Sequence, residues 1–156
     1  MALQLWLLRH GEAVPHDSKP DDERELTDRG RDQARAAGRS LSALEVEVHL
    51  CFTSPKVRAR ETAELACAEL GVDPMVHEPL GGEFDGRDAL ELLSGAGGDQ
   101  RVLIVGHEPD FSQVVYDLSG ARIDLKKGGV AGLRMDGSRG ELIVLLRPRE
   151  LDRIGC

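Results

Sequence analysis

The chain of 156 residues has about the length of one domain, and we expect a single domain over residues 1–156. Its net charge of −8, from 20 Lys and Arg against 28 Asp and Glu, argues against nucleic acid or an anionic membrane as a partner. Hydrophobic residues, at 40%, suffice for a folded core, whereas 3% aromatic residues leave little material for stacking on bases or sugars.

Two sequence features predict where the protein resides. The apolar run over residues 3–8 is too short to span a membrane and has no basic segment before it, so we expect neither a membrane anchor nor a signal peptide. Cys51, Cys67 and Cys156 form no Cys-x-x-Cys pair and leave one cysteine over. This pattern favours reduced thiols and a cytoplasmic location.

The first third of the chain has two strand patterns with a helix pattern between them. The run over residues 3–8 is typical of a buried strand. Thr27 opens a segment reaching Leu44 whose apolar residues recur at helical spacing, which predicts a helix. Apolar residues then alternate over residues 46–52, as they do in a strand.

Ser54 and Pro55 predict the start of a second helix, with Ser54 as its N-cap and Pro55 at its first helical position. That helix is expected to end at Gly71, because glycine readily adopts the backbone conformation that stops a helix. A short strand over residues 75–77 and one or two helical turns over residues 88–94 are expected next.

The last third begins with an apolar run over residues 101–106, a buried-strand pattern, after which Pro109 can open a helix reaching Ser119. Strands over residues 132–135 and 142–146, joined by a turn-rich segment, predict a hairpin at the sheet edge. The alternation predicts an α/β fold: a three-layer sandwich with a mostly parallel central sheet, helices on both faces and an edge hairpin near the C-terminus.

Basic residues follow three of the expected strands. Arg9 and His10 come after the first strand, Arg58 lies on the opening turn of the second helix, and His107 follows the strand over residues 101–106. Ligands of open α/β sheets bind outside the carboxyl ends of the strands, so these side chains are expected to converge. Four potential cations in one crevice cost stability unless an anion occupies it. A phosphoryl group is the expected guest.

The chemistry of these residue types suits phosphoryl transfer. Arginine donates two hydrogen bonds to phosphate oxygens through its planar fork, and the free N–H groups at the start of the second helix add partial positive charge. A neutral imidazole can attack phosphorus, and neighbouring arginines disfavour its protonated form. The residues alone therefore predict a phosphoryl site with a histidine nucleophile.

The segment Leu8-Arg9-His10-Gly11-Glu12 resembles the Arg-His-Gly signature of the histidine phosphatase superfamily, which includes phosphoglycerate mutases, fructose-bisphosphatases and bacterial phosphohistidine phosphatases. The resemblance extends over nearly the whole chain. Further segments match the family in order: Leu26-Thr27-Asp28-Arg29-Gly30 with Gln33-Ala34, Thr53-Ser54-Pro55-Lys56-Val57-Arg58-Ala59 with Thr62-Ala63, and Val105-Gly106-His107-Glu108-Pro109.

The resemblance implies a role for each site residue. His10 would be the nucleophile that becomes phosphorylated, Arg9 and Arg58 would hold phosphoryl oxygens, and His107 would donate hydrogen bonds to the same oxygens. The reaction would be ping-pong: the dephosphorylated product leaves, and water then releases phosphate from His10. No metal and no other cofactor is implied.

The resemblance also narrows the substrate. Only about thirty residues separate Gly71 from Arg101, too few for the lid that longer family members carry, so we expect an open pocket for a large substrate. The length and the segments over residues 26–30 and 126–130 look most like the small bacterial phosphohistidine phosphatases. Protein phosphohistidine is the first expectation. The alternatives are a phosphatase of small phosphomonoesters, a sugar-phosphate phosphatase or mutase of the same superfamily, and a phosphoprotein-binding module without catalysis.

Other residues receive weaker assignments. Imidazole, with a pKa of about 6.5, leaves phosphorus with less help from an acid than an alkoxide does. Where an acid is needed, Glu83 is the candidate among the carboxylates after the second helix. Glu12 is expected to adjust the electrostatics of the site or to bond a loop amide, and Lys126 and Lys127 could line the pocket and attract an acidic partner. Neither a His-x-x-x-His metal motif nor a nucleotide-binding glycine motif occurs.

Overall fold

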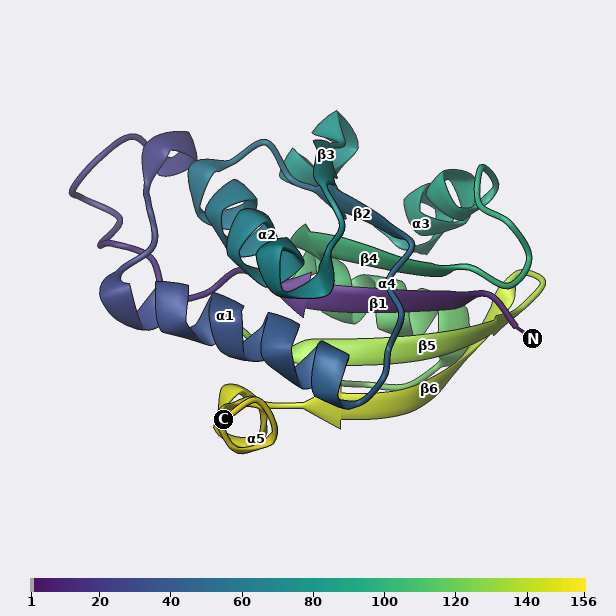
Figure 1. Ribbon diagram of the computed structural model, residues 1–156. Helices are drawn as coiled ribbons and strands as arrows, with labels where there is room; N and C mark the ends of the chain where they lie inside the picture. Colours follow the sequence, from purple (N-terminus) through teal and green to yellow (C-terminus); the bar gives the residue numbers. More distant parts are fainter. Residues whose placement is uncertain (1) are drawn as a thin grey trace.

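A mixed sheet forms the middle layer of the protein in the computed structural model, which describes residues 2–156 (Figure 1). The order of strands within residues 2–156 is β3 (Pro74–Val76), β2 (Leu50–Thr53), β4 (Arg101–Gly106), β1 (Gln4–Arg9), β5 (Val130–Asp136) and β6 (Arg139–Leu146). Neighbours from β3 to β1 pair in parallel, whereas β5 is antiparallel to both β1 and β6. The predicted α/β class, with its mostly parallel sheet and edge hairpin, is confirmed.

Helices cover both faces of the sheet. One face carries α1 (Asp28–Ala43), α2 (Val57–Leu70) and α5 (Pro148–Ile154), and Figure 1 shows α1 and α2 in front of the strands. The other face carries α3 (Gly86–Leu93) and α4 (Asp110–Ser119). Short 3₁₀ helices span Asp21–Glu23 and Glu78–Gly81. No helix described within residues 2–156 is long and apolar enough to cross a bilayer.

The strand β1 shows why a continuous apolar run makes this layer. Leu5 and Leu7 are fully buried beneath α3 and α4, while Trp6 and Leu8 are buried beneath α1 and α2. Successive side chains of a strand point to opposite faces, so a strand covered on both faces needs apolar residues throughout. Each such burial stabilises the fold by about 1.5–3 kcal/mol. The sheet therefore holds the ends of β1 and β4 rigidly.

The strand expected over residues 46–52 is shorter in the structure. It begins at Leu50, because the chain first makes a turn at the end of α1. Glu45 adopts a left-handed conformation with φ of 60°, and the amide of Val46 donates to the carbonyl oxygen of Leu41 at 2.9 Å. The apolar residues alternate before Leu50 because Val48 is buried against the core, and not because this segment pairs with a strand.

The start of α2 also differs from the prediction. The helix begins at Val57 with Lys56 as its N-cap, not at Pro55. The Ser54 hydroxyl oxygen does accept a hydrogen bond from the Lys56 amide at 3.2 Å, as a capping side chain would. The Ser54 hydroxyl also contacts His107, and the chain bends at Pro55 and Lys56 before the helix begins.

The C-terminal helix α5 was not predicted. Pro148 begins it, and the Glu150 carboxylate accepts a hydrogen bond from the Arg147 amide at 2.9 Å. Proline at the first helical position with a carboxylate soon after is a recognisable start signal. The hairpin strands β5 and β6 are longer than expected but lie where the sequence predicted them.

Candidate active site

The carboxyl ends of β1, β2 and β4 bring two histidines and an arginine into contact. The strands are parallel neighbours, so residues that follow them meet at one edge of the sheet. The rings of His10 and His107 lie 5.2 Å apart between centroids. Arg58 lies on the first turn of α2, which follows β2, and its Nε donates a hydrogen bond to Nε2 of His10 at 3.4 Å. All three side chains are buried.

His10 is held in one tautomer by its neighbour in the chain. Its Nδ1 lies 2.7 Å from the carbonyl oxygen of Gly11, and because a carbonyl can only accept, Nδ1 carries the proton. The lone pair is therefore on Nε2, facing Arg58. Burial, together with the charges of Arg58, Arg9 and Lys127, lowers the pKa of His10 to about 3 despite the bond to Gly11. A neutral imidazole thus presents an unprotonated nitrogen.

His107 has the complementary arrangement. Its Nε2 lies 2.7 Å from the Ser54 hydroxyl, and its Nδ1 is buried without a hydrogen-bond partner among residues 2–156. Burial, with the charges of His10, Arg58 and Lys56, lowers the pKa of His107 to about 3. A neutral His107 that accepts from Ser54 carries its proton on Nδ1. That N–H has no acceptor among the described residues.

Arg58 is anchored by the segment before α1. Its Nη1 donates to the Asp21 carbonyl oxygen at 2.8 Å, and its Nη2 lies 3.4 Å from the Asp21 carboxylate. Lys56 pairs with the same carboxylate at 3.1 Å. Although burial alone raises the pKa of Asp21, the hydrogen bond from Lys56 and the charge of Arg58 outweigh it and lower that pKa to about 2. Asp21 is therefore ionised and orients two cations.

Arg9 is positioned by the loop before β5. Its Nη1 donates to the Leu125 carbonyl oxygen at 2.9 Å, while its Nε is buried without a partner in the described residues. The Leu125 amide in turn lies 3.4 Å from Oε2 of Glu108. The other carboxylate oxygen of Glu108, Oε1, accepts from the Ser112 amide at 2.7 Å. Burial lowers the pKa of Arg9 against the opposing charge of Glu108. The guanidinium retains unused donors.

Close packing of the loop after β1 on the first turn of α1 explains the glycines of the matching motifs. A side chain on Gly11 would place its Cβ 2.5 Å from the Gly30 carbonyl oxygen, and one on Gly30 would place its Cβ 2.0 Å from the Glu12 carbonyl oxygen. The Gly11 amide donates to the Thr62 hydroxyl at 3.1 Å, and the Glu12 amide donates to the Gln33 side chain at 2.8 Å. These contacts hold the loop that carries His10 against α1 and α2.

The structure places the remaining candidates as follows. Glu83 is exposed, with no hydrogen bond or ion pair to His10 or His107 among the described residues; its charge instead helps to raise the pKa of Asp110, which burial raises most. The Glu12 carboxylate accepts from the Thr27 hydroxyl at 3.0 Å and not from an amide. No group of three His, Cys, Asp or Glu side chains within residues 2–156 could hold a metal ion.

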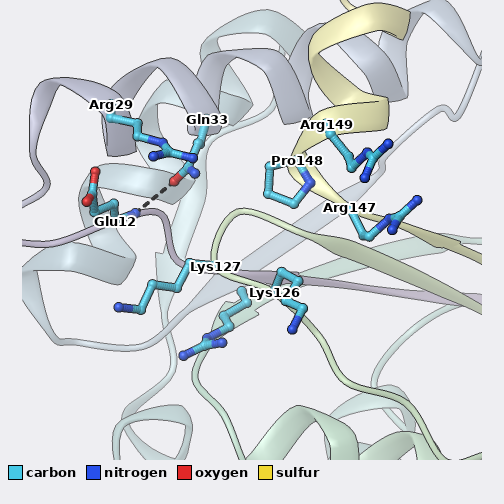
Figure 2. Close-up of a pocket in the computed structure, with 9 residues that line it drawn as sticks. Glu12, Arg29, Gln33, Lys126, Lys127, Arg147, Pro148 and Arg149 are labelled. Carbon is cyan, nitrogen blue, oxygen red and sulfur yellow. Dashed lines mark hydrogen bonds between the residues drawn. The ribbon is translucent and has the colours of Figure 1, made fainter.

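Two site residues were missed at the level of sequence. Lys56 stands within the matched segment before Arg58, which was a usable signal. Asp21 lies in a polar segment with no periodicity or motif, and only its contact with Arg58 reveals it. A pocket beside the site is lined by Lys126 and Lys127, at the position where the sequence suggested them (Figure 2).

Comparison with known proteins agrees with this geometry. The model of the histidine phosphatase superfamily (branch 1) matches residues 5–94. An uncharacterized protein of Picosynechococcus sp. is 33% identical over 163 residues, covering 96% of this chain and 99% of that protein. The structure of the protein histidine phosphatase SixA complexed with tungstate superposes with a TM-score of 0.85 at 25% identity, covering 95% of this chain and 99% of that one. The putative phosphohistidine phosphatase SixA from Nakamurella multipartitia has a TM-score of 0.77 at 26% identity, with 95% and 97% covered. The chain belongs to the histidine phosphatase superfamily.

Proposed function

We propose that this protein removes the phosphoryl group from phosphohistidine in proteins, through a covalent phosphohistidine intermediate on His10. The observation that carries the proposal is the unprotonated Nε2 of His10, which faces Arg58 and lies beside the ring of His107. Donors that are already oriented around a nucleophile stabilise the charge that develops on the phosphoryl oxygens. The similarity to SixA structures supports the same substrate class.

In the first step, Nε2 of His10 forms a bond to phosphorus while the bond from phosphorus to the substrate nitrogen breaks. The electron pair stays with the departing imidazole, which takes a proton from solvent. The ring of His10 becomes positively charged, and the Gly11 carbonyl that accepts from Nδ1 stabilises this charge. Arg9, Arg58 and the Nδ1–H of His107 hold the three outer oxygens.

In the second step, water attacks phosphorus on the side opposite Nε2. The bond from Nε2 to phosphorus breaks, phosphate leaves, and His10 returns to its neutral form. The low pKa of His10 favours this release, because a weakly basic nitrogen is a good leaving group. His10 thus serves as nucleophile and leaving group in turn.

The exposed position of Glu83 fits a substrate whose leaving group is imidazole, since such a group needs little help from an acid. An alkyl phosphate would need an acid, and Glu83 remains our candidate for that case. Glu83→Gln is therefore expected to slow hydrolysis of an alkyl phosphate by tenfold or more and phosphohistidine hydrolysis by less than about twofold.

The decisive experiment compares the parent with His10→Ala. Phosphate release from a phosphohistidine peptide and from p-nitrophenyl phosphate is expected to disappear in the variant. In the parent, an alkaline quench followed by mass spectrometry is expected to find the phosphoryl group on His10. Equal rates in parent and variant would refute His10 as the nucleophile, whereas absence of turnover in the parent would leave a binding module as the better description. A sugar phosphate with a far higher kcat/KM would assign the protein to another branch of substrates.

The cytoplasm is the compartment that we propose for this activity, as part of signal transduction through phosphohistidine. Cys51 and Cys67 are buried free thiols and Cys156 is an exposed one. Free thiols of this kind persist where glutathione keeps cysteine reduced.

A further inference from the structure

A pocket of about 620 Å³ opens next to the active site and is strongly cationic (Figure 2). Among its nine lining residues are one carboxylate, Glu12, and six cations: Arg9, Arg29, Lys126, Lys127, Arg147 and Arg149. The chain as a whole has a net charge of −8, so this is a local reversal of charge. The mechanism above uses Arg9 alone of these cations.

The pocket adjoins the candidate active site through Arg9. Arg9 lines the pocket and is the last residue of β1, directly before His10. Lys127, on the loop before β5, is close enough that its charge acts on His10. A peptide whose phosphoryl group sits at His10 can therefore reach this pocket with its neighbouring side chains.

Much of the positive charge of the pocket is not neutralised by the protein. The Glu12 carboxylate is engaged by the Thr27 hydroxyl, and among residues 2–156 no ion pair is found for Arg29 or Lys127. Arg147 and Arg149 do pair with the same carboxylate of Glu150, at 2.8 Å and 3.6 Å, and Lys126 pairs with Asp124 at 2.6 Å. Exposed cations without partners are the groups that an acidic ligand can use.

The distribution of charge favours several separate carboxylates over one compact anion. Figure 2 shows Arg29 at one side of the pocket, Arg147 and Arg149 at the other, and Lys126 and Lys127 between them. These side chains come from α1, from the loop before β5 and from the start of α5. A compact phosphate binds best where guanidinium forks converge, whereas an extended peptide can spread its charges. The volume is also within the range of about 300–1,000 Å³ that holds ligands larger than a single anion.

We infer that this pocket binds acidic side chains of the substrate protein beside its phosphohistidine. The inference deepens the proposed function and rests on it for the identity of the substrate. On a chain that otherwise repels acidic proteins, a cationic pocket steers an acidic partner toward the active site. It would also select among phosphohistidine proteins by the charge around the modified residue.

The test measures binding apart from catalysis. Two short dye-labelled peptides without phosphate, one rich in Asp and one with Asn at the same positions, are titrated with the protein by fluorescence anisotropy. The parent is expected to bind the Asp peptide at least about fivefold more tightly, with a preference that shrinks as salt rises. Arg29→Gln with Arg149→Gln is expected to remove most of that preference.

A matched control removes the same net charge elsewhere. Arg87 and Arg139 are exposed and lie beside the β5–β6 turn, near Ser138, at the other end of the sheet. Arg87→Gln with Arg139→Gln is expected to retain the preference within about twofold. If both double variants lost the preference for the Asp peptide equally, that preference would depend on net charge and not on the pocket, and the inference would be overturned. Equal binding of the two peptides by the parent would also overturn it.

Two further outcomes separate the possibilities. If tripolyphosphate displaces the Asp peptide at lower concentrations than the unlabelled peptide does, the pocket is a site for a phosphate-rich small molecule and the inference is wrong. Turnover of phosphohistidine peptides with Asp or Asn flanks tests the function separately. Absence of turnover together with a preserved binding preference would contradict the proposed function and leave the acidic-peptide site standing.

Discussion

Asp21 holds Arg58 through two different groups: its backbone carbonyl oxygen accepts from Nη1 at 2.8 Å, and its carboxylate lies 3.4 Å from Nη2. The carbonyl fixes the position of the guanidinium, whereas the carboxylate also cancels part of the positive charge of the site. The two contributions can be separated because a substitution changes only the side chain.

Asp21→Asn is expected to leave Arg58 in place and to raise the positive potential at His10. Inorganic phosphate, the product of the proposed reaction, is expected to bind about two- to fivefold more tightly, with the gain reduced at high salt. The measurement is the inhibition constant of phosphate. Asp22→Asn is the control, because Asp22 lies farther from Lys56, at 3.8 Å, and is more exposed. Weaker phosphate binding in Asp21→Asn would mean that the carboxylate is needed to position Arg58.

Arg58→Gln is expected to lower kcat/KM by about a hundredfold or more, as loss of an oriented donor to a developing anion does in other enzymes. The matched variant is Arg60→Gln. Arg60 lies on the same helix, is exposed and has no side-chain bond among residues 2–156. Its kcat/KM is expected to stay within about twofold of the parent. Similar losses in both variants would point to general charge steering and away from a contact with the phosphoryl group.

Stability is expected to depend on pH through the two buried histidines. His10 and His107 have a pKa of about 3 in the folded protein, against about 6.5 for an unfolded chain. Between these values the unfolded state binds more protons, so the free energy of unfolding falls as the pH falls below about 6.5. Together the two groups approach a slope of about 2.7 kcal/mol per pH unit.

Urea unfolding between about pH 7 and pH 5 measures this slope, and His10→Gln supplies the comparison. The variant lacks one of the two groups, so its slope is expected to be smaller by an amount that rises to about 1.4 kcal/mol per pH unit near pH 5. Carboxylates titrate in both proteins and cancel in the difference. Parallel pH curves for parent and variant would show that the pKa of His10 is the same in the folded and unfolded states.

Gly30→Ala is expected to destabilise the fold by about 3 kcal/mol or to prevent folding, because its Cβ would lie 2.0 Å from the Glu12 carbonyl oxygen. Gly98→Ala is the control, since nothing lies within 4 Å of its added Cβ. That variant is expected to change the free energy of unfolding by no more than about 0.5 kcal/mol. Chemical denaturation gives both values, and equal stability of the two variants would argue against close packing of the loop after β1 on α1.

Local patterns predicted which side chains meet at the edge of the sheet. His10 and His107 could be placed together because each follows a continuous apolar run, and such runs form parallel strands whose ends share one edge. Patterns were less reliable where a residue is buried but is not part of a paired strand. Val48 alternates as a strand residue does, yet it packs against the core from an irregular segment before β2, so the expected strand was too long by four residues at its start.

The sequence by itself determined the α/β class, the motifs of the site and the residues at the strand ends. Only the tertiary structure decided that Asp21 anchors Arg58, that Ser54 orients His107, and that cations from α1, α5 and the loop before β5 line one pocket. The physical reason is the distance along the sequence between the residues that interact. Strand and helix patterns arise from the repeat geometry of neighbouring residues, whereas these contacts join segments whose meeting depends on how helices and loops pack over the sheet.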